Sequence, residues 1–420
     1  MICVDSKALA QASNFPYVFT VGNMKIVPSD NALIQQIRLV RDAGAYTMYR
    51  QIEKSEGPEV VVNGRRMVMV GSNDYLGLAS DPRVVEAAAK AIAQYGTGPG
   101  GSRILCGNIS LHEELEARVA AHLGKKWALV YTTGFMANIG TISALAEPGD
   151  TLLCDKECHA SIIEGCQMTR CRISTFAHNN FNSAMSKLEM LIKKPNRKRI
   201  FLFTEGVFSM SGLVAPLDRL AKLKDIAPNL VIFVDDAHGF GVLGEGHGTA
   251  HAHNCTDQID IIGGTFSKAF ASIGGFIASD DKNMKDYLKH RSRPLLFSAA
   301  LPAASTAAAL KVFDILDCEP ERITRLMANA AMTRKGLSDM GFTVNNGRSP
   351  IISVSIGSDE AAHAFVTILD ELGIFAVSAV YPAVSRGASI IRLALTSTHE
   401  DRHITQVLEA FATVKQRLQF

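Results

Sequence analysis

The sequence has almost no excess of charge of either sign and no long apolar run. Its 43 basic and 41 acidic residues are interspersed, with neither a basic stripe nor an acidic tail, so we expect no binding to nucleic acid. No stretch approaches the roughly 18 consecutive apolar residues of a membrane-spanning helix. The N-terminus lacks a basic segment followed by an apolar core and a small-residue cleavage site. These absences predict a cytoplasmic protein with no integral membrane segment.

Paired Cys-x-x-Cys motifs are also absent. Four of the eight cysteines, together with His159, crowd into residues 154–171, but three, seven and four residues separate them. Structural zinc sites commonly use closely paired cysteines, so this spacing argues against a metal site. Reduced thiols are the better interpretation, and we expect no bound metal.

Short apolar runs alternate along the chain with longer amphipathic stretches. The 420 residues, 47% of them hydrophobic, are enough to bury a substantial core. Seven short runs read as strands, at residues 127–131, 151–154, 173–176, 200–204, 230–234, 259–263 and 275–278. Helical patterns fall between them, for example at residues 111–123, 183–192 and 217–226. This alternation is typical of an α/β fold with a mostly parallel sheet and helices on both faces.

The pattern divides the chain into three parts. We expect an N-terminal arm over residues 1–75, a large domain over residues 76–310 and a smaller α+β domain over residues 311–420. A long helix at about residues 301–316 would link the two domains. Strands of the smaller domain are expected near residues 351–356 and 390–395.

Two strand ends carry residues that suit one cofactor. One strand runs into Asp235 and, three residues later, His238; the next runs into Thr265, Ser267 and Lys268. This is the arrangement that a fold-type I enzyme needs to hold pyridoxal 5'-phosphate (PLP). Lys268 would form a Schiff base with the cofactor aldehyde, and Asp235 would keep the pyridine nitrogen protonated so that the ring accepts carbanion electrons. His238 would bond the phenolate oxygen, while Thr265 and Ser267 would meet the phosphate.

Each of these residues has an ordinary explanation when taken alone. A lysine after a glycine-rich strand is most often a solvated surface residue, and an aspartate at a strand end is commonly a helix cap. The combination in this order, with each member after an apolar run, favours the cofactor site. Ligands of such sheets bind beyond the carboxyl ends of the strands, where Asp235 and Lys268 fall.

Further segments would complete the pocket. A strand enters a helix at Gly134, so the backbone amides there and at Phe135 can bind phosphate, although turns of this kind are often only structural. His159 suits stacking on the pyridine face, or is an ordinary loop histidine. Glu205 and Ser209 follow another strand, and we expect both at the cofactor, with Ser209 near one of its oxygens.

The glycine-rich run at residues 96–103 is too flexible for a core helix. A loop that approaches the substrate or a neighbouring subunit closely would explain its composition.

Taken together, these motifs resemble the α-oxoamine synthases. The resemblance runs from about residue 46 to the C-terminus and rests on residues 72–78, 96–103, 158–161, 205–210, 235–239 and 265–268. Within the family, residues 49–53, 263–276 and 294–299 look most like the bacterial serine palmitoyltransferase branch, whereas residues 72–78 equally suit an 8-amino-7-oxononanoate synthase. Two departures stand out. Cys158 replaces the usual serine before the histidine, and residues 380–383 lack the Arg-Pro-Pro-Thr of many oxononanoate synthases.

The resemblance implies a fold-type I PLP-dependent transferase, similar to aspartate aminotransferase, that condenses an amino acid with an acyl thioester and releases CO2. Arg392 matches the arginine that binds the amino-acid carboxylate, a task suited to a bidentate guanidinium. His159 would stack on the ring and bond the same carboxylate, and Lys268 would act as the base. The family also implies a homodimer with a shared active site, into which Asn73 and Ser102 reach from the partner.

The expected substrates are L-serine and a long-chain acyl-CoA, giving a 3-keto long-chain base. Alanine or glycine, and a different acyl group on CoA or an acyl carrier protein, stay open. An aminotransferase or lyase on the same fold is a further alternative, which the motifs around His159 and residues 96–103 disfavour. A non-catalytic partner subunit is another, but such partners typically lack the lysine, and Lys268 is present.

Overall fold

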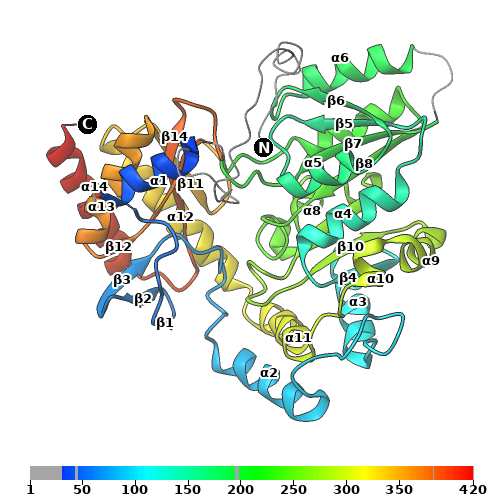
Figure 1. Cartoon of the computed structure of the whole chain (residues 1–420), viewed down its shortest axis with the longest axis horizontal. Helices are drawn as coiled ribbons and strands as arrows, with labels where there is room; N and C mark the ends of the chain where they lie inside the picture. The colour runs from blue at the N-terminus through cyan, green and yellow to red at the C-terminus, as the bar shows by residue number, and fades with distance from the viewer. Residues whose placement is uncertain (1–30, 43–45, 194–197, 382, 420) are drawn as a thin grey trace, which may run out of the picture.

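The computed structural model describes residues 31–42, 46–193, 198–381 and 383–419. The chain forms a large and a small lobe, with α11 (Ala303–Cys318) packed against α2 (Pro82–Tyr95) between them (Figure 1). None of the helices in these ranges combines the length and apolarity needed to cross a bilayer. The seven cysteines in the same ranges carry free thiols.

A seven-stranded sheet forms the centre of the large lobe, in the order β4-β10-β9-β8-β7-β5-β6. Its strands are β4 (Trp127–Tyr131), β5 (Thr151–Asp155), β6 (Arg172–Phe176), β7 (Ile200–Glu205), β8 (Leu230–Asp235), β9 (Ile261–Thr265) and β10 (Gly275–Ser279). Neighbouring strands from β6 to β9 are parallel, and β10 runs antiparallel to both β4 and β9. The predicted strands and the mostly parallel sheet are therefore confirmed.

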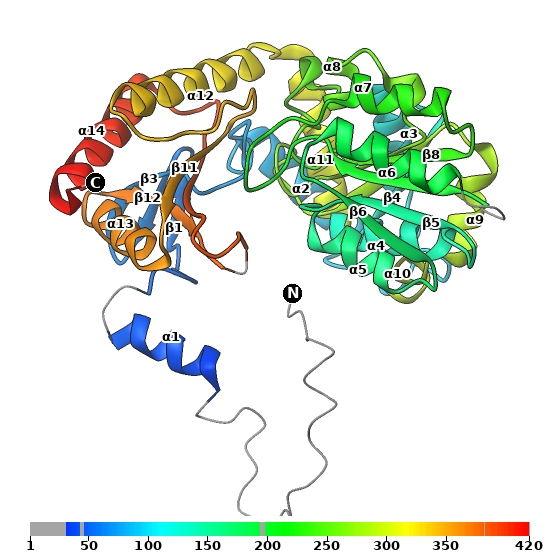
Figure 2. The same cartoon turned by 90° about the horizontal axis from the view of Figure 1, so that it is seen from above.

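Helices cover both faces of this sheet (Figure 2). Strand β4 shows why: Ala128 and Val130 belong to one apolar cluster and Leu129 and Tyr131 to the other, because successive side chains point to opposite faces. The first cluster takes residues from α3, α6 and α7, and the second from α4, α5, α9 and α10. These helices are α3 (Ser110–Leu123), α4 (Gly134–Leu145), α5 (Ala160–Gln167), α6 (Phe181–Ile192), α7 (Leu217–Ala221), α9 (Lys282–Arg291) and α10 (Arg293–Phe297).

Short helical segments complete the large lobe. They are α8 (Thr249–Ala252) and the 3-10 turns η2 (Lys222–Asp225), η3 (Gly244–Gly246) and η4 (Thr256–Gln258). The helix expected over residues 217–226 is thus divided into α7 and η2.

The small lobe combines the C-terminal part of the chain with strands from the N-terminal part. Its elements are β11 (Ile351–Gly357), β12 (Ile374–Phe375), β13 (Val377–Ala379), β14 (Ser389–Ala394), α12 (Glu321–Asp339), α13 (Asp359–Glu371) and α14 (Asp401–Leu418). Strands β11, β14 and β13 form an antiparallel sheet. Strands β1 (Lys54–Glu56), β2 (Glu59–Val62) and β3 (Arg65–Met69) form a second sheet with β12, and α1 (Ala32–Asp42) precedes them. The sequence did not predict this pairing of β3 with β12.

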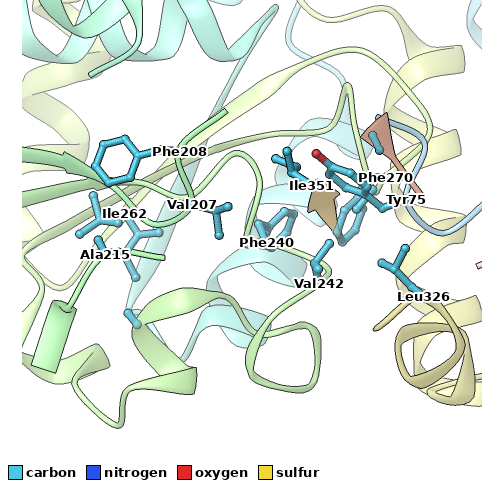
Figure 3. Packing of buried hydrophobic residues seen from close by; sticks show 14 of the residues in the cluster. Tyr75, Val207, Phe208, Ala215, Phe240, Val242, Ile262, Phe270, Leu326 and Ile351 are labelled. Atoms are coloured by element: carbon cyan, nitrogen blue, oxygen red, sulfur yellow. The ribbon is translucent and has the colours of Figure 1, made fainter. Parts of the chain in front are cut away.

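One apolar cluster extends across both lobes. It includes Phe240 and Phe270, whose rings stack at 4.4 Å, together with Leu326 of α12 and Ile351 of β11 (Figure 3). Because close-packed interiors resist deformation, this shared core fixes β14 relative to the edge of the large sheet. Arg392 lies on β14.

Candidate active site

Two carboxylates meet at the carboxyl edge of the large sheet. Glu205 ends β7 and is paired in register with Asp235, which ends β8. Both side chains are buried. Burial, and then the neighbouring charge of Asp235, raise the pKa of Glu205 well above its ordinary value. The two carboxyl groups therefore resist carrying charge together, and a cationic group beside them would relieve that repulsion.

Lys268 lies beside these carboxylates, after the end of β9. Burial lowers the pKa of its amine, while the charges of Asp235 and Glu205 oppose the shift and Arg392 adds to it. A lower pKa leaves more of the amine unprotonated, which is the form that attacks an aldehyde or accepts a proton from carbon. The structure therefore brings Lys268 and Asp235 together, as the sequence predicted.

Asp235 is held in place by two N–H groups. Its Oδ2 accepts from Nδ2 of Asn138 at 2.6 Å, and its Oδ1 accepts from the backbone N–H of Ala237 at 3.1 Å. These donors suit an ionised carboxylate, which only accepts hydrogen bonds. Asn138 lies on α4 and was not singled out as a site residue from the sequence.

His159 caps the N-terminus of α5 beside Glu205. Its backbone N–H donates to Oε1 of Glu205 at 2.6 Å, and its Nδ1 accepts from the backbone N–H of Ser161. The pKa of His159 lies below its ordinary value, mainly because partial burial of the ring removes water that would stabilise its charged form. Glu205, expected at the cofactor, thus also anchors the histidine. The stacking role of His159 stays a prediction.

His238 is buried within reach of the charge of Lys268. Burial, and then the charges of Lys268 and Arg392, lower its pKa well below the ordinary value, so the ring is neutral. Its Nδ1 lies 2.6 Å from the hydroxyl of Tyr75. Burial raises the pKa of Tyr75 to about 12, so this hydroxyl keeps its proton. Tyr75 belongs to the motif of residues 72–78, but the sequence analysis assigned it no role.

Arg392 reaches the same cluster from the small lobe. The residue is 7% exposed, its Nε donates to the backbone carbonyl of Ser209 at 2.7 Å, and its Nη2 donates to Oδ1 of Asn73 at 2.9 Å. Ser209, expected near a cofactor oxygen, therefore contributes its carbonyl to Arg392. Asn73 contacts Arg392 of its own chain, and its expected reach into a partner's active site stays a prediction.

The N-terminus of α4 approaches the end of β9 closely. A Cβ at Gly134 would lie 3.1 Å from Cβ of Thr265, and a Cβ at Gly275 would overlap the backbone of Gly134. The Thr265 hydroxyl donates to the carbonyl of Gly274 at 2.7 Å and accepts from the backbone N–H of Ser267. Unpaired amides at a helix start, beside hydroxyls, are a donor set for a phosphate.

Two predicted residues have a less direct relation to this cluster. Phe135, on the first turn of α4, is 40% exposed, and its ring lies 6.1 Å from that of His159. Ser102 is 6% exposed, and its hydroxyl has no hydrogen-bond partner among the described residues. The expected role of Ser102 across a dimer stays a prediction.

The donors present fit PLP. A helix start suits the phosphate, the carboxylate of Asp235 suits a pyridinium, and a lysine with a lowered pKa suits the aldehyde. Fold and site together define a PLP-dependent enzyme of fold type I.

Comparisons with known proteins narrow this class. A family model described as aminotransferase class I and II matches residues 65–411. Serine palmitoyltransferase of Bacteriovorax stolpii is 39% identical over 389 residues, 92% of this chain and 92% of that protein. 8-Amino-7-oxononanoate synthase 1 of Bacillus velezensis is 37% identical over 382 residues, covering 90% and 96%.

Comparison with solved structures points to the same two enzymes. A variant of serine palmitoyltransferase from S. paucimobilis with a bound PLP–myriocin aldimine superposes with a TM-score of 0.90 at 30% identity, covering 94% of this chain and 100% of that one. An 8-amino-7-oxononanoate synthase from Francisella tularensis has a TM-score of 0.70 at 26% identity, covering 84% and 99%. The chain belongs to the class I and II aminotransferase family and, within it, to the α-oxoamine synthases, which are PLP-dependent acyltransferases.

Proposed function

We propose that the enzyme condenses L-serine with a long-chain acyl-CoA, releasing CoA and CO2 to give a 3-keto long-chain base. The observation that carries this proposal is the whole-chain likeness to solved serine palmitoyltransferases, with a TM-score of 0.90 against 0.70 for an oxononanoate synthase. Sequence identity separates the two branches poorly, at 39% and 37%. The second candidate is therefore an oxononanoate synthase-like condensation that uses alanine and a different acyl thioester.

Arg392 is suited to hold the carboxylate of the amino acid. Ser209 and Asn73 engage its Nε and one Nη2 hydrogen. The Tyr75 side chain also hydrogen-bonds with the guanidinium, which carries five N–H donors in all, so donors remain to pair with an anion. The contacts with Ser209 and Asn73 also fix the plane of the guanidinium. A carboxylate bound there would lie within the same charged cluster as Lys268, since Arg392 lowers the pKa of that amine.

Lys268 is suited to remove the proton from the α-carbon. Its lowered pKa provides a free amine, and the carboxylates of Asp235 and Glu205 stabilise the ammonium that forms. Bound PLP supplies an electron sink for the carbanion at that carbon. Asp235 would hold a proton on the pyridine nitrogen, and neutral His238 would bond the phenolate oxygen.

A matrix of amino acids against acyl thioesters tests the proposal. L-serine, L-alanine and glycine are each combined with palmitoyl-CoA, acetyl-CoA, pimeloyl-CoA and acyl carrier protein thioesters, and thiol release and product mass are measured. We expect serine with palmitoyl-CoA to be preferred by about tenfold or more in kcat/KM, since each buried CH2 contributes roughly 0.8 kcal/mol. Preference for alanine with pimeloyl thioesters would establish the second candidate. Lys268→Ala is the inactive control.

We also infer a homodimer that shares its active sites. Leu105 is 80% exposed and Ile104 56% exposed, immediately after the glycine-rich run, and exposed apolar clusters commonly mark interfaces. Light scattering of the purified protein measures the mass. A cytoplasmic location stays a prediction.

A further inference from the structure

One buried amide joins two groups of the active site. Asn138 lies on α4 one turn after Gly134, so the two residues share a face of the helix. Asn138 is 3% exposed, and its Nδ2 donates to Oδ2 of Asp235 at 2.6 Å and to Oγ of Ser161 at 2.9 Å. Because an ionised carboxylate only accepts, Nδ2 rather than Oδ1 faces Asp235. Both N–H groups of the amide are thereby engaged.

Ser161 passes this orientation on to His159. The backbone N–H of Ser161 donates to Nδ1 of His159 at 3.3 Å, and Oγ of Ser161 lies 2.7 Å from the same nitrogen. A backbone N–H cannot accept, so Nδ1 carries the lone pair. Since Oγ of Ser161 accepts from Asn138, its own proton is available for Nδ1. The neutral ring then carries its proton on Nε2.

We propose that Asn138 is a positioning residue that couples the charge of Asp235 to the orientation and tautomer of His159. One N–H stabilises the carboxylate that faces the pyridine nitrogen. The other directs the Ser161 proton to Nδ1, which leaves Nε2–H of His159 as a donor toward the substrate carboxylate. The inference depends on the PLP chemistry of the family and on the role of His159, and is independent of which acyl thioester is used.

The surroundings of Asn138 favour this role over simple packing. The other buried residues of α4 are mostly small or apolar, and a buried amide is costly unless it is hydrogen-bonded. Across the sheet, a Cβ at Gly263 would lie 3.2 Å from Oδ1 of Asn138 and 3.3 Å from the ring of Phe233. Glycine at this position of β9 leaves the room that the amide occupies.

The test compares the wild type with Asn138→Leu, Asn138→Ala, Ser161→Ala and the double variant Asn138→Leu/Ser161→Ala. Leucine keeps the branching at Cγ and the number of side-chain heavy atoms of asparagine and removes both donors, whereas alanine also opens a cavity. The dissociation constant of PLP from the apoenzyme is measured by quenching of Trp127, the single tryptophan. Binding of L-serine, L-alanine and glycine to the holoenzyme is followed by the absorbance of the cofactor.

We expect both Asn138 variants to weaken PLP binding by about tenfold or more, as loss of an orienting partner commonly does, and Ser161→Ala to weaken it less than about threefold. Asn138→Leu and Ser161→Ala should both weaken amino-acid binding. The double variant should be no worse than Asn138→Leu, because the two residues act in one chain of hydrogen bonds.

PLP affinity in Asn138→Leu within about threefold of the wild type, or multiplicative losses of amino-acid affinity in the double variant, would overturn the proposal. If both Asn138 variants fail to fold, amino-acid binding by Ser161→Ala tests the proposal instead. An altered pH dependence of amino-acid binding between about pH 5 and pH 8 supports the coupling, and an unchanged one overturns it. Failure of the proposed function is seen separately, as a wild type that binds PLP but releases no thiol with any of the acyl donors.

Discussion

Replacing Asp235 with asparagine separates the charge of this carboxylate from its shape. In the structure, Oδ2 accepts from Asn138 and Oδ1 accepts from the backbone N–H of Ala237. An amide offers only one acceptor, so in either orientation one N–H group of the new side chain opposes an existing donor. Losing that hydrogen bond in a buried place costs about 1–3 kcal/mol of folding stability. The variant should therefore fold with a lowered melting temperature.

The effect of Asp235→Asn on catalysis should be larger. A neutral amide cannot hold a proton on the pyridine nitrogen, so the carbanion at the α-carbon loses most of its stabilisation. We expect about 4 kcal/mol less stabilisation of the transition state for proton removal, which is about a thousandfold in rate. The assay is exchange of the α-proton of L-serine, L-alanine and glycine in deuterated water without acyl donor, followed by NMR at confirmed PLP occupancy.

The neighbouring aspartate supplies the matched control. Asp236 is also buried, but it accepts from the backbone N–H and the hydroxyl of Thr249, both at 2.6 Å. Asp236→Asn should leave the exchange rate within about threefold of the wild type. Exchange by Asp235→Asn within about tenfold of the wild-type rate would refute the reasoning, because the charge at position 235 would then contribute little.

Four other predictions follow from named contacts. Borohydride reduction followed by peptide mapping should tag Lys268, and Lys268→Ala should abolish turnover; a tag on another lysine would contradict the site. Arg392→Ala should raise the KM of the amino acid about a hundredfold and that of the acyl thioester less than about threefold, since a charged hydrogen-bonded contact contributes about 1.5–3 kcal/mol. Burial raises the pKa of Asp236 to about 6, above its unfolded value, so stability should fall by about 3 kcal/mol as pH rises from about 4 to about 6. The free energy of unfolding of Asp236→Asn, measured with urea, should not fall over this pH range. A fall equal to that of the wild type would contradict the prediction. Mixed dimers of Lys268→Ala and an inactive variant in the loop at residues 96–102 should regain partial activity, and no recovery after verified subunit exchange would count against a shared site.

The strands that carry the catalytic residues could be predicted because each is a short apolar run bounded by polar or glycine residues. Strand β8 ends at Asp235, one residue beyond the run expected from the sequence, and β9 ends at Thr265, two residues beyond its run. The predicted strand ends were therefore accurate enough to place Asp235 and Lys268 at the same edge of the sheet. Arg392 was identified only by resemblance, since no local pattern shows that β14 packs against this edge.

Pairings between distant segments were not predictable from local patterns. Ile374 of β12 pairs with Val68 of β3, and the strand is only two residues long, so its period cannot be read. Asn73 shows a related difficulty. Its contact with Arg392 of the same chain could not be read from the sequence, and its expected reach into a partner's active site stays a prediction.

The two adjacent aspartates show how distant residues decide a local role. Successive side chains at a strand end point in opposite directions, so Asp235 and Asp236 cannot serve one site. Gly206, Gly239 and Gly248 surround Asp236, and a Cβ at any of them would overlap its carboxylate. Those glycines and Thr249 enclose Asp236 in the interior, while Asp235 is left facing the amide of Asn138. An amide within an apolar helix is a signal, visible in the sequence, that a buried partner exists. The partner itself emerges only when α4 packs over β9 and β10, next to β8 in the sheet.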